Sequence, residues 1–324
     1  MSKVTERSAH SQFVKFLDQN GKITKLQSGN RRFHSTETAL LYFADEILKN
    51  MDDKKVSVIV LLDMSKAFDS IRHDLMLSKL HNIGVSSGAC SWFGSYLSQR
   101  CQVVNIANSV SDPLPVTVGV PQGSILGPVL FTLYVNDLLS VPRHCQAMGY
   151  VDDTKIFLGF PSSQISDAVT ALNKDLSEIA RWCCTNSLLI NPDKTKLLVI
   201  GVPQLTRSLP SIPPVTLLGK EIKLVTVAKD LGVIIDSSLS FNEHVTKTVS
   251  DCLHRLIRIN RVKHLLDRKT LLSLINAFVF SKLFYCSSVW SNTSKTNVKR
   301  LQLVQNFAGR IVLGLRKYDR ILRA

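Results

Sequence analysis

The chain has 324 residues, of which 45% are hydrophobic and 20% charged, and this balance excludes a wholly disordered protein. No apolar run approaches the roughly 20 residues of a membrane helix, and seven cysteines without a C-x-x-C pair argue for a reducing, intracellular compartment. The net charge of +15 is concentrated in residues 244–324, which hold sixteen Lys and Arg against three Asp and Glu.

The first part of the chain predicts a mixture of helices and strands. Apolar spacing indicates a helix over residues 35–49, and the β-branched run 56–62 is typical of a central strand buried on both faces. That strand ends at Asp63. Two further helices and a pair of strands around a turn are predicted downstream, at 71–80 and 91–97 and at 101–107 and 114–118.

The second part continues this α+β pattern up to a basic, helical tail. Two short strands enclose the turn Asp152-Asp153-Thr154. Composition turns basic after a loop at 236–241, so we expect a domain boundary there. The other predicted elements are helices at 128–139 and 165–183 and strands at 147–151, 155–158, 196–200 and 231–235.

Three carboxylates carry the strongest chemical signal. Asp63 closes a buried strand, and Asp152 and Asp153 are adjacent in a tight turn, where like charges repel. If the two segments lie on neighbouring strands, the acids form one cluster that could hold two Mg²⁺ ions for an in-line phosphoryl displacement. The alternative is that Asp63 caps a turn and the pair lies on a surface loop.

Several collinear segments together cover almost the whole chain. They are LDMSKAFD at 62–69, GVPQGSILGP at 119–128, YVDD at 150–153, NPDKTK at 191–196, LGV at 231–233, and parts of 27–40. In that order they resemble motifs A, B, C, D and E and a fingers motif of reverse transcriptases from non-LTR (LINE-type) retrotransposons. As an ordered set they are specific, although the Asp-Asp pair alone would be weak.

This resemblance implies an α+β right-hand polymerase: an antiparallel palm sheet with packed helices, partial fingers and an α-helical thumb. The expected boundaries are 1–55 for the partial fingers, 56–240 for the palm with motifs A to E, and 241–324 for the basic thumb. The implied activity is RNA-directed DNA synthesis with an RNA template, a DNA primer and dNTPs. An inactive nucleic-acid-binding remnant is one alternative, and an intron-maturase or RNA-copying polymerase is another.

The resemblance also implies roles for individual residues. Asp63, Asp152 and Asp153 would be the catalytic acids and ligands of two Mg²⁺ ions, for which Mn²⁺ would substitute. Phe68 would lie under the sugar of the incoming nucleotide and exclude a 2′-hydroxyl, unless it is an ordinary core residue.

Four more positions would contact the nucleotide or template. Gln122 and Gly123 belong to motif B, where glycines let the backbone approach closely, although a plain turn before a buried helix also fits them. Arg31 would contact the triphosphate, and Lys194 would protonate the departing pyrophosphate. An exposed loop arginine and a solvated lysine are the alternatives for these two.

In the basic tail, Arg255, Arg258 and Arg261 recur every three residues with Lys263 nearby. They are expected to hold nucleic acid through phosphate contacts without reading sequence, while a solvated basic surface is the alternative. The apolar residues expected to pack on the opposite side are Leu253, Leu256, Ile257 and Leu265.

The sequence also departs from the family pattern. It begins in what resembles the middle of the fingers and contains no endonuclease, so we expect nicking to come from a missing part of the element or another protein. Asn30 stands where relatives commonly carry an aromatic residue, and Val151 where many carry alanine. The family's life cycle implies nucleus and cytoplasm as locations, and the chain has no clear import signal.

Overall fold

A five-stranded sheet lies at the centre of the chain, in the order β13-β10-β1-β8-β7. The computed structural model describes residues 2–107, 109–316 and 319. Neighbouring strands are antiparallel except for β13, which runs parallel to β10 at one edge. The predicted antiparallel sheet is therefore confirmed, with one parallel edge strand added. The strands are β1 (Lys55–Leu62), β7 (Gln146–Tyr150), β8 (Asp153–Pro161), β10 (Lys196–Ile200) and β13 (Lys223–Val225).

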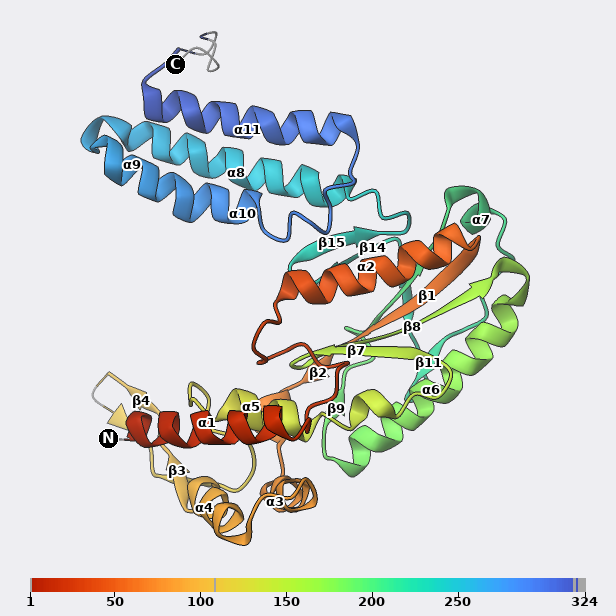
Figure 1. Cartoon of the computed structure of the whole chain (residues 1–324), viewed down its shortest axis with the longest axis vertical. Coiled ribbons are helices and arrows are strands. Elements are labelled where there is room, and N and C mark those ends of the chain that lie inside the picture. Colours follow the sequence, from red (N-terminus) through yellow and green to blue (C-terminus); the bar gives the residue numbers. More distant parts are fainter. Residues whose placement is uncertain (1, 108, 317–318, 320–324) are drawn as a thin grey trace.

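Strand β1 is buried on both faces, as its continuous apolar sequence predicts. Val58 and Val60 pack into one hydrophobic core, which includes helix α6 (Ile165–Thr185). Ile59 packs into a second core on the opposite face, which includes helix α2 (Thr36–Asp52). Figure 1 shows α2 and α6 on either side of the sheet.

Four helices form a lobe beside the sheet, which we call the lower lobe because it lies below the sheet in Figure 1. Their buried side chains join the same core as α6, so this lobe is continuous with the sheet. The first of the four was not among the predicted helices. They are α1 (Ser2–Gln19), α3 (His73–Asn82), α4 (Ser87–Leu97) and α5 (Gly127–Tyr134).

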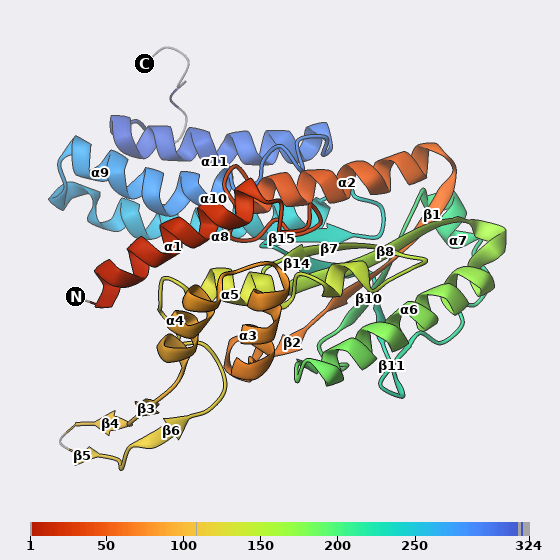
Figure 2. The same ribbon diagram turned by 60° about the horizontal axis from the view of Figure 1, so that its bottom comes forward.

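A narrow β arm projects from the lower lobe, as Figure 2 shows. The predicted pairing of its two sides is confirmed, but each side is broken into two short strands. Apolar side chains on the arm are open to solvent, with Ile106 71% and Leu114 62% exposed. The strands are β3 (Arg100–Gln102), β4 (Asn105–Ile106), β5 (Ser109–Val110) and β6 (Leu114–Val116).

The predicted strand over 231–235 is confirmed for residues 233–235, whereas residues 231 and 232 form the turn of a hairpin. Strand β14 (Val227–Asp230) pairs with β15 (Val233–Asp236), and the turn consists of Leu231 and Gly232. Both turn residues have positive φ, 43° and 88°, which no extended strand allows. The remaining short elements are β2 (Met64–Ser65), β9 (Leu189–Ile190), α7 (Pro203–Arg207), β11 (Thr216–Leu217) and β12 (Lys220–Glu221), with single helical turns at 67–70, 138–140, 162–164, 263–265 and 276–280.

A C-terminal helical bundle (residues 242–313) packs on the α2 side of the sheet. Its entry is fixed by Asp236, whose carboxylate accepts hydrogen bonds from three backbone N–H groups between residues 238 and 241. The second core runs without interruption from α2 through the sheet into the bundle. The helices are α8 (Asn242–Val262), α9 (Arg268–Ile275), α10 (Ser281–Leu283) and α11 (Lys295–Leu313).

Two exclusions made from the sequence can be compared with this structure. Within the described residues, no helix combines the length and apolar character needed to span a bilayer. All seven cysteines lie in the described part of the chain, and each is a free thiol.

Candidate active site

Two of the three predicted acids lie at the same end of two neighbouring strands of the sheet. Leu62, the last residue of β1, pairs with Thr154 of β8 in antiparallel register. Asp63 follows Leu62 and Asp153 precedes Thr154, so the same register sets the two acids side by side. The sheet therefore brings together two segments that are distant in the sequence.

The third acid lies in the turn that joins β7 to β8. Tyr150 pairs with Asp153, so the hairpin loop has only two residues, Val151 and Asp152. The sequence interpretation put Asp153 inside the turn, whereas it begins strand β8. All three acids thus lie at the same end of the sheet.

Strand alternation places Asp63 and Asp153 on the same face of the sheet. Ile59 and Leu61 of β1 pack in the second core, and Asp63 continues their alternation. On β8, Phe157 packs in that core, and Asp153 is an even number of residues before it. Both carboxylates therefore point to the side of the sheet that carries α2 and the C-terminal bundle.

The acids influence one another electrostatically. Partial burial raises the pKa of the Asp153 carboxyl, and the nearby carboxylates of Asp152, Asp230 and Asp63 raise it further, while Lys155 acts in the opposite direction. Hard divalent cations bind carboxylate oxygens and offset this kind of repulsion. In the described ranges, no three or more His, Cys, Asp or Glu side chains are already arranged around one metal position.

Motif D is attached to the backbone of Asp63. The Asp63 N–H donates to Oγ1 of Thr195 at 3.4 Å, and Thr195 donates to the Asn191 carbonyl at 2.9 Å. The Asn191 N–H in turn donates to the Asp63 carbonyl at 2.9 Å. Thr195 is 1% exposed, and its role was missed from the sequence, because nothing local marks a threonine as a partner of residue 63. Lys194 lies on the same turn with an exposed side chain.

Phe68 lies in a single helical turn, Ala67–Ser70, immediately after β2. Its ring is half-buried and stacks on Phe131 of α5, with centroids 4.5 Å apart and planes 23° apart. Phe131 is fully buried, so it gives Phe68 a fixed support. The structure thus makes Phe68 partly a packing residue and leaves one side of it accessible.

Motif B packs directly on motif A. The Nε2 amide of Gln122 donates a 2.8 Å hydrogen bond to Oδ1 of Asp69, and both side chains are exposed. A Cβ atom on Gly119 would lie 3.0 Å from the Asp69 backbone, so glycine allows this close approach. Gly123 has φ +74° with open space around it, so its glycine serves the backbone conformation. Asp69 received no role from the sequence.

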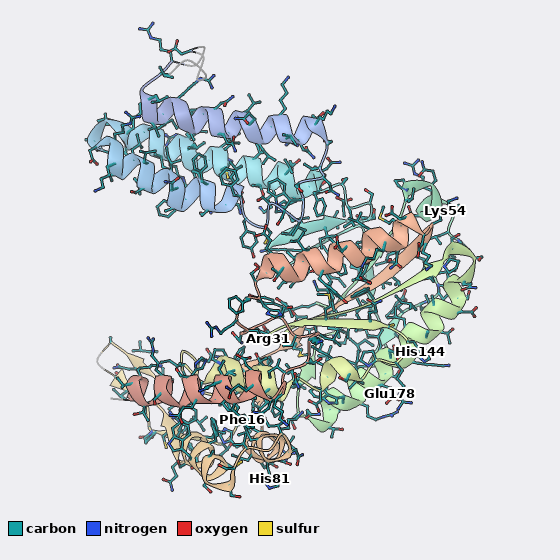
Figure 3. All side chains as sticks on the ribbon, viewed as in Figure 1. Phe16, Arg31, Lys54, His81, His144 and Glu178 are labelled. Carbon is teal, nitrogen blue, oxygen red and sulfur yellow. The ribbon has the colours of Figure 1, made fainter. Side chains whose placement is uncertain are left out.

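Arg31 lies on the connection between α1 and α2, as Figure 3 shows. Its Nη1 donates to two backbone carbonyls, of Thr24 at 2.8 Å and Gln27 at 3.0 Å. The neighbouring Asn30 has φ +55°, a conformation that Asn tolerates better than an aromatic residue. Its amide donates to α5 at the Pro128 carbonyl. In the structure Arg31 therefore stabilises its own loop.

The basic residues of α8 are exposed, as their spacing predicts. The exposed set contains Arg255, Arg258 and Arg261. Arg255 is also anchored, because its Nη1 donates to the carbonyl of Phe278 at 2.5 Å. The expected packing of all four apolar residues is wrong in part. Leu256 is fully buried and Leu253 packs against the second core, but Ile257 is 44% and Leu265 74% exposed.

A cavity of about 390 Å³ lies between the β14–β15 hairpin and helices α8 and α10. Four basic side chains line it together with Tyr285, and three of them were not singled out in the sequence. These basic residues are Lys229, Lys247, Arg255 and Lys282. The hairpin of motif E and the bundle therefore meet at a cationic surface.

Comparison with known proteins agrees with this geometry. A model of the family described as reverse transcriptase (RNA-dependent DNA polymerase) matches residues 2–248. The chain is 30% identical, over 99% of its length, to the probable RNA-directed DNA polymerase from transposon BS of Drosophila melanogaster, and covers 36% of that protein. It is 25% identical, over 99% of its length, to the RNA-directed DNA polymerase from mobile element jockey of the same organism, and covers 35% of it.

These relatives are longer, and the chain spans about a third of their length. Among solved structures, apo telomerase from Candida tropicalis superimposes with a TM-score of 0.52 at 13% identity, over 96% of this chain and 50% of that one. This likeness confirms the predicted fold class. With the family match over most of the chain, the predicted resemblance to non-LTR retrotransposon enzymes is confirmed, and the chain belongs to the reverse transcriptase family.

Proposed function

We propose that this chain is an RNA-directed DNA polymerase that extends the 3′-hydroxyl of a DNA primer with dNTPs along an RNA template. The observation that carries the proposal is the β1–β8 register, which brings Asp63 and Asp153 to the same end of two neighbouring strands, beside the turn that contains Asp152. A structural role does not account for three acids at one sheet end, because their repulsion destabilises the fold.

Reverse transcriptases depend on a divalent metal, and the donor set fits one. Asp63, Asp152 and Asp153 would hold two Mg²⁺ ions, with Mn²⁺ as a substitute. Bound there, the ions would stabilise the attacking and leaving oxygens of an in-line displacement. The raised pKa of Asp153 supports this assignment, because its causes include the charges of the other two acids.

The chain's own residues would position the reactants. The primer 3′-hydroxyl would lose its proton to solvent and form a bond to the α-phosphorus as the bond from that phosphorus to pyrophosphate breaks, and Lys194 would donate a proton to the leaving pyrophosphate. Phe68, supported by Phe131, would exclude a 2′-hydroxyl from the sugar position. Gln122 and Gly123 would lie against the nucleotide and template.

Arg31 would contact the triphosphate through N–H groups other than those of Nη1, since a guanidinium has five N–H donors and Nη1 supplies the bonds to both carbonyls. The template–primer duplex would lie along the exposed basic face of α8, held through its phosphates by Arg255, Arg258 and Arg261. Lys263, which is half-buried in the helical turn after α8, would add a further phosphate contact.

We also propose the division into partial fingers (1–55), palm (56–240) and thumb (241–324). Support comes from the C-terminal bundle, which begins at Asn242 directly after the Asp236 cap. Helices α3 and α4 pack beside α1 in the lower lobe, so this lobe takes elements from both of the first two ranges.

The test is primer extension with an RNA template, a DNA primer, dNTPs and Mg²⁺. The wild-type chain is expected to extend the primer, and Asp152→Asn, which keeps the size of the side chain, to abolish extension. The exposed Asp18→Asn on α1 is the matched control and should match the wild type. Equal extension by Asp152→Asn would refute the site.

Two other results would favour the alternatives. Salt-sensitive binding of the duplex by a wild-type chain that never extends it would indicate a nucleic-acid-binding remnant. Efficient extension with rNTPs would indicate an RNA-copying polymerase and would contradict the role given to Phe68.

A further inference from the structure

The connection between α1 and α2 forms an extra strand-like edge beside the catalytic hairpin. Gly149 of β7 donates its N–H to the Leu26 carbonyl at 2.9 Å, and its carbonyl accepts from Ser28 N–H at 2.9 Å. Gln27, between them, forms a parallel bridge with Gly149. This backbone pairing places the side chain of Gln27 next to the turn of the hairpin.

Gln27 is 1% exposed. The oxygen and the nitrogen of its side-chain amide both form hydrogen bonds to the backbone of Val151, and the oxygen also bonds to the backbone of Gly29. Oε1 accepts from Val151 N–H at 3.0 Å and from Gly29 N–H at 2.8 Å. Nε2 donates to the Val151 carbonyl at 3.4 Å. A buried amide placed this way supplies the hydrogen bonds that a neighbouring strand would otherwise give.

Val151 needs such support because its backbone is strained. Its φ is +60°, in the left-handed region. A β-branched side chain is a clear outlier there, and such a strained conformation persists only where the surroundings enforce it. Asp152 is the next residue, so the conformation of Val151 sets where the Asp152 carboxylate points.

Gly29 provides the space for this arrangement. A Cβ atom built on Gly29 would lie 2.4 Å from the Val151 nitrogen and 2.5 Å from its Cγ2. No side chain fits there without moving the turn. The fingers segment and the catalytic turn are therefore in direct van der Waals contact, with Gln27 as the hydrogen-bonding link.

We propose that Gln27 is a positioning residue that holds the strained Val151–Asp152 turn in its catalytic conformation. The proposal rests on the polymerase function proposed above, and it adds a residue that acts only through Val151. Gln27 does not touch substrate in this assignment. Its loss is expected to slow the chemical step and leave substrate affinity unchanged.

The kinetic test compares Gln27→Leu with the wild type and with Gln12→Leu, an exposed glutamine on α1. We expect kcat for primer extension to fall at least tenfold in Gln27→Leu while KM for dNTP changes less than twofold. Adding Val151→Gly, which removes the strain at positive φ, should restore kcat at least threefold. A rise in KM with unchanged kcat, or no recovery with Val151→Gly, would overturn the proposal.

Hydrogen exchange gives a readout that does not depend on activity. The Val151 N–H is expected to exchange at least tenfold faster in Gln27→Leu than in the wild type, with the β1 amides unchanged. Equal protection of Val151 in both proteins would overturn the proposal even if the wild-type chain did not extend primers. Failure of the polymerase proposal and failure of this one are thereby distinguishable.

A second variant guards against misfolding of Gln27→Leu. Gln27→Glu keeps an acceptor oxygen for the Val151 and Gly29 N–H groups, but it replaces the donor with a second oxygen and adds a negative charge. It should retain Val151 protection and hold a kcat above that of Gln27→Leu. Val151 exchange in Gln27→Glu as fast as that of a free amide would count against Gln27 as the support.

Discussion

The Nε2 amide of Gln122 and Oδ1 of Asp69 are joined by a 2.8 Å hydrogen bond that links motif B to motif A. Asp69 lies one residue after Phe68, so the same short helical turn carries the predicted sugar-contacting ring and the acceptor for Gln122. The positions of the two side chains predicted to contact the nucleotide, Phe68 and Gln122, therefore both depend on this helical turn.

Breaking that bond should weaken nucleotide binding. Asp69→Leu removes the acceptor, and we expect KM for dNTP to rise about fivefold, close to the ~1 kcal/mol of an ordinary hydrogen bond. Asp69→Asn keeps an acceptor oxygen and should stay near the wild-type value. Steady-state primer extension measures both, and equal effects of the two variants would contradict this role.

The stacked rings of Phe68 and Phe131 should govern sugar discrimination. Phe68→Ala is expected to raise rNTP use relative to dNTP by about tenfold or more, because a steric barrier is removed. Phe131→Leu should give a smaller rise, since it only loosens the support. Phe16→Leu in the lower lobe is the control, and an unchanged rNTP/dNTP ratio in Phe68→Ala would contradict the assignment.

The buried ion pair between Lys155 and Asp230 should matter for stability. Their side chains are 3% and 4% exposed, and the ammonium lies 4.6 Å from the centre of the Phe43 ring. Lys155→Met alone leaves a buried carboxylate and should lower the free energy of unfolding by about 3–5 kcal/mol. Adding Asp230→Leu should recover most of that loss. Urea unfolding measures both, and no recovery would mean that the pair itself stabilises the fold.

His244 should make stability depend on pH. Burial, with a smaller effect from Lys282, lowers the pKa of this imidazole to about 4. In the unfolded chain histidine takes up a proton below about pH 6.5. The free energy of unfolding should therefore fall as pH drops from 6.5 to 4, by about 3 kcal/mol from this residue.

The control for this effect is His244→Gln, which keeps an acceptor for the Ile234 N–H. The difference in unfolding free energy between wild type and variant should change across pH 6.5 to 4 and be flat above 7. A flat difference across the whole range would show that His244 is not the titrating group.

The exposed arginines of α8 should set the salt dependence of nucleic-acid binding. Each phosphate neutralised contributes about 0.7–0.9 to the slope of log K against log salt. The double variant Arg258→Gln/Arg261→Gln should reduce that slope by roughly 1.4–1.8. Lys15→Gln on α1, an exposed lysine, is the control. An unchanged slope in the double variant would place the duplex elsewhere.

Sequence patterns predicted the central sheet because its strands are locally distinctive. The apolar run of β1 and the two short strands around Asp152 are where their composition indicates. Leu231 and Gly232 were wrongly included in the predicted strand of motif E, because an apolar Leu231 gives no sign of a left-handed turn. Ile257 and Leu265 were misplaced because an apolar residue on the surface looks the same in sequence as one in the core.

The residues that support the site through hydrogen bonds could not be predicted from the sequence, for a different reason. Thr195 bonds to a residue 132 positions away, and Gln27 to one 124 positions away. Neither residue lies in a local pattern that points to its partner. Such contacts follow from how the sheet and loops pair in three dimensions, whereas the acids could be found from motif spacing alone.

The uninterrupted second core has a consequence for dissecting this molecule. Phe43 of α2, Phe157 of β8 and Val245 of α8 are all buried in it, so the helices after Phe241 share one apolar core with α2 and the sheet. A fragment that stops at residue 241 would expose the apolar residues of this core to solvent, so it is expected to precipitate rather than remain folded and active. Proteolytic cleavage after Phe241 should accordingly yield aggregates, not two independently folded fragments.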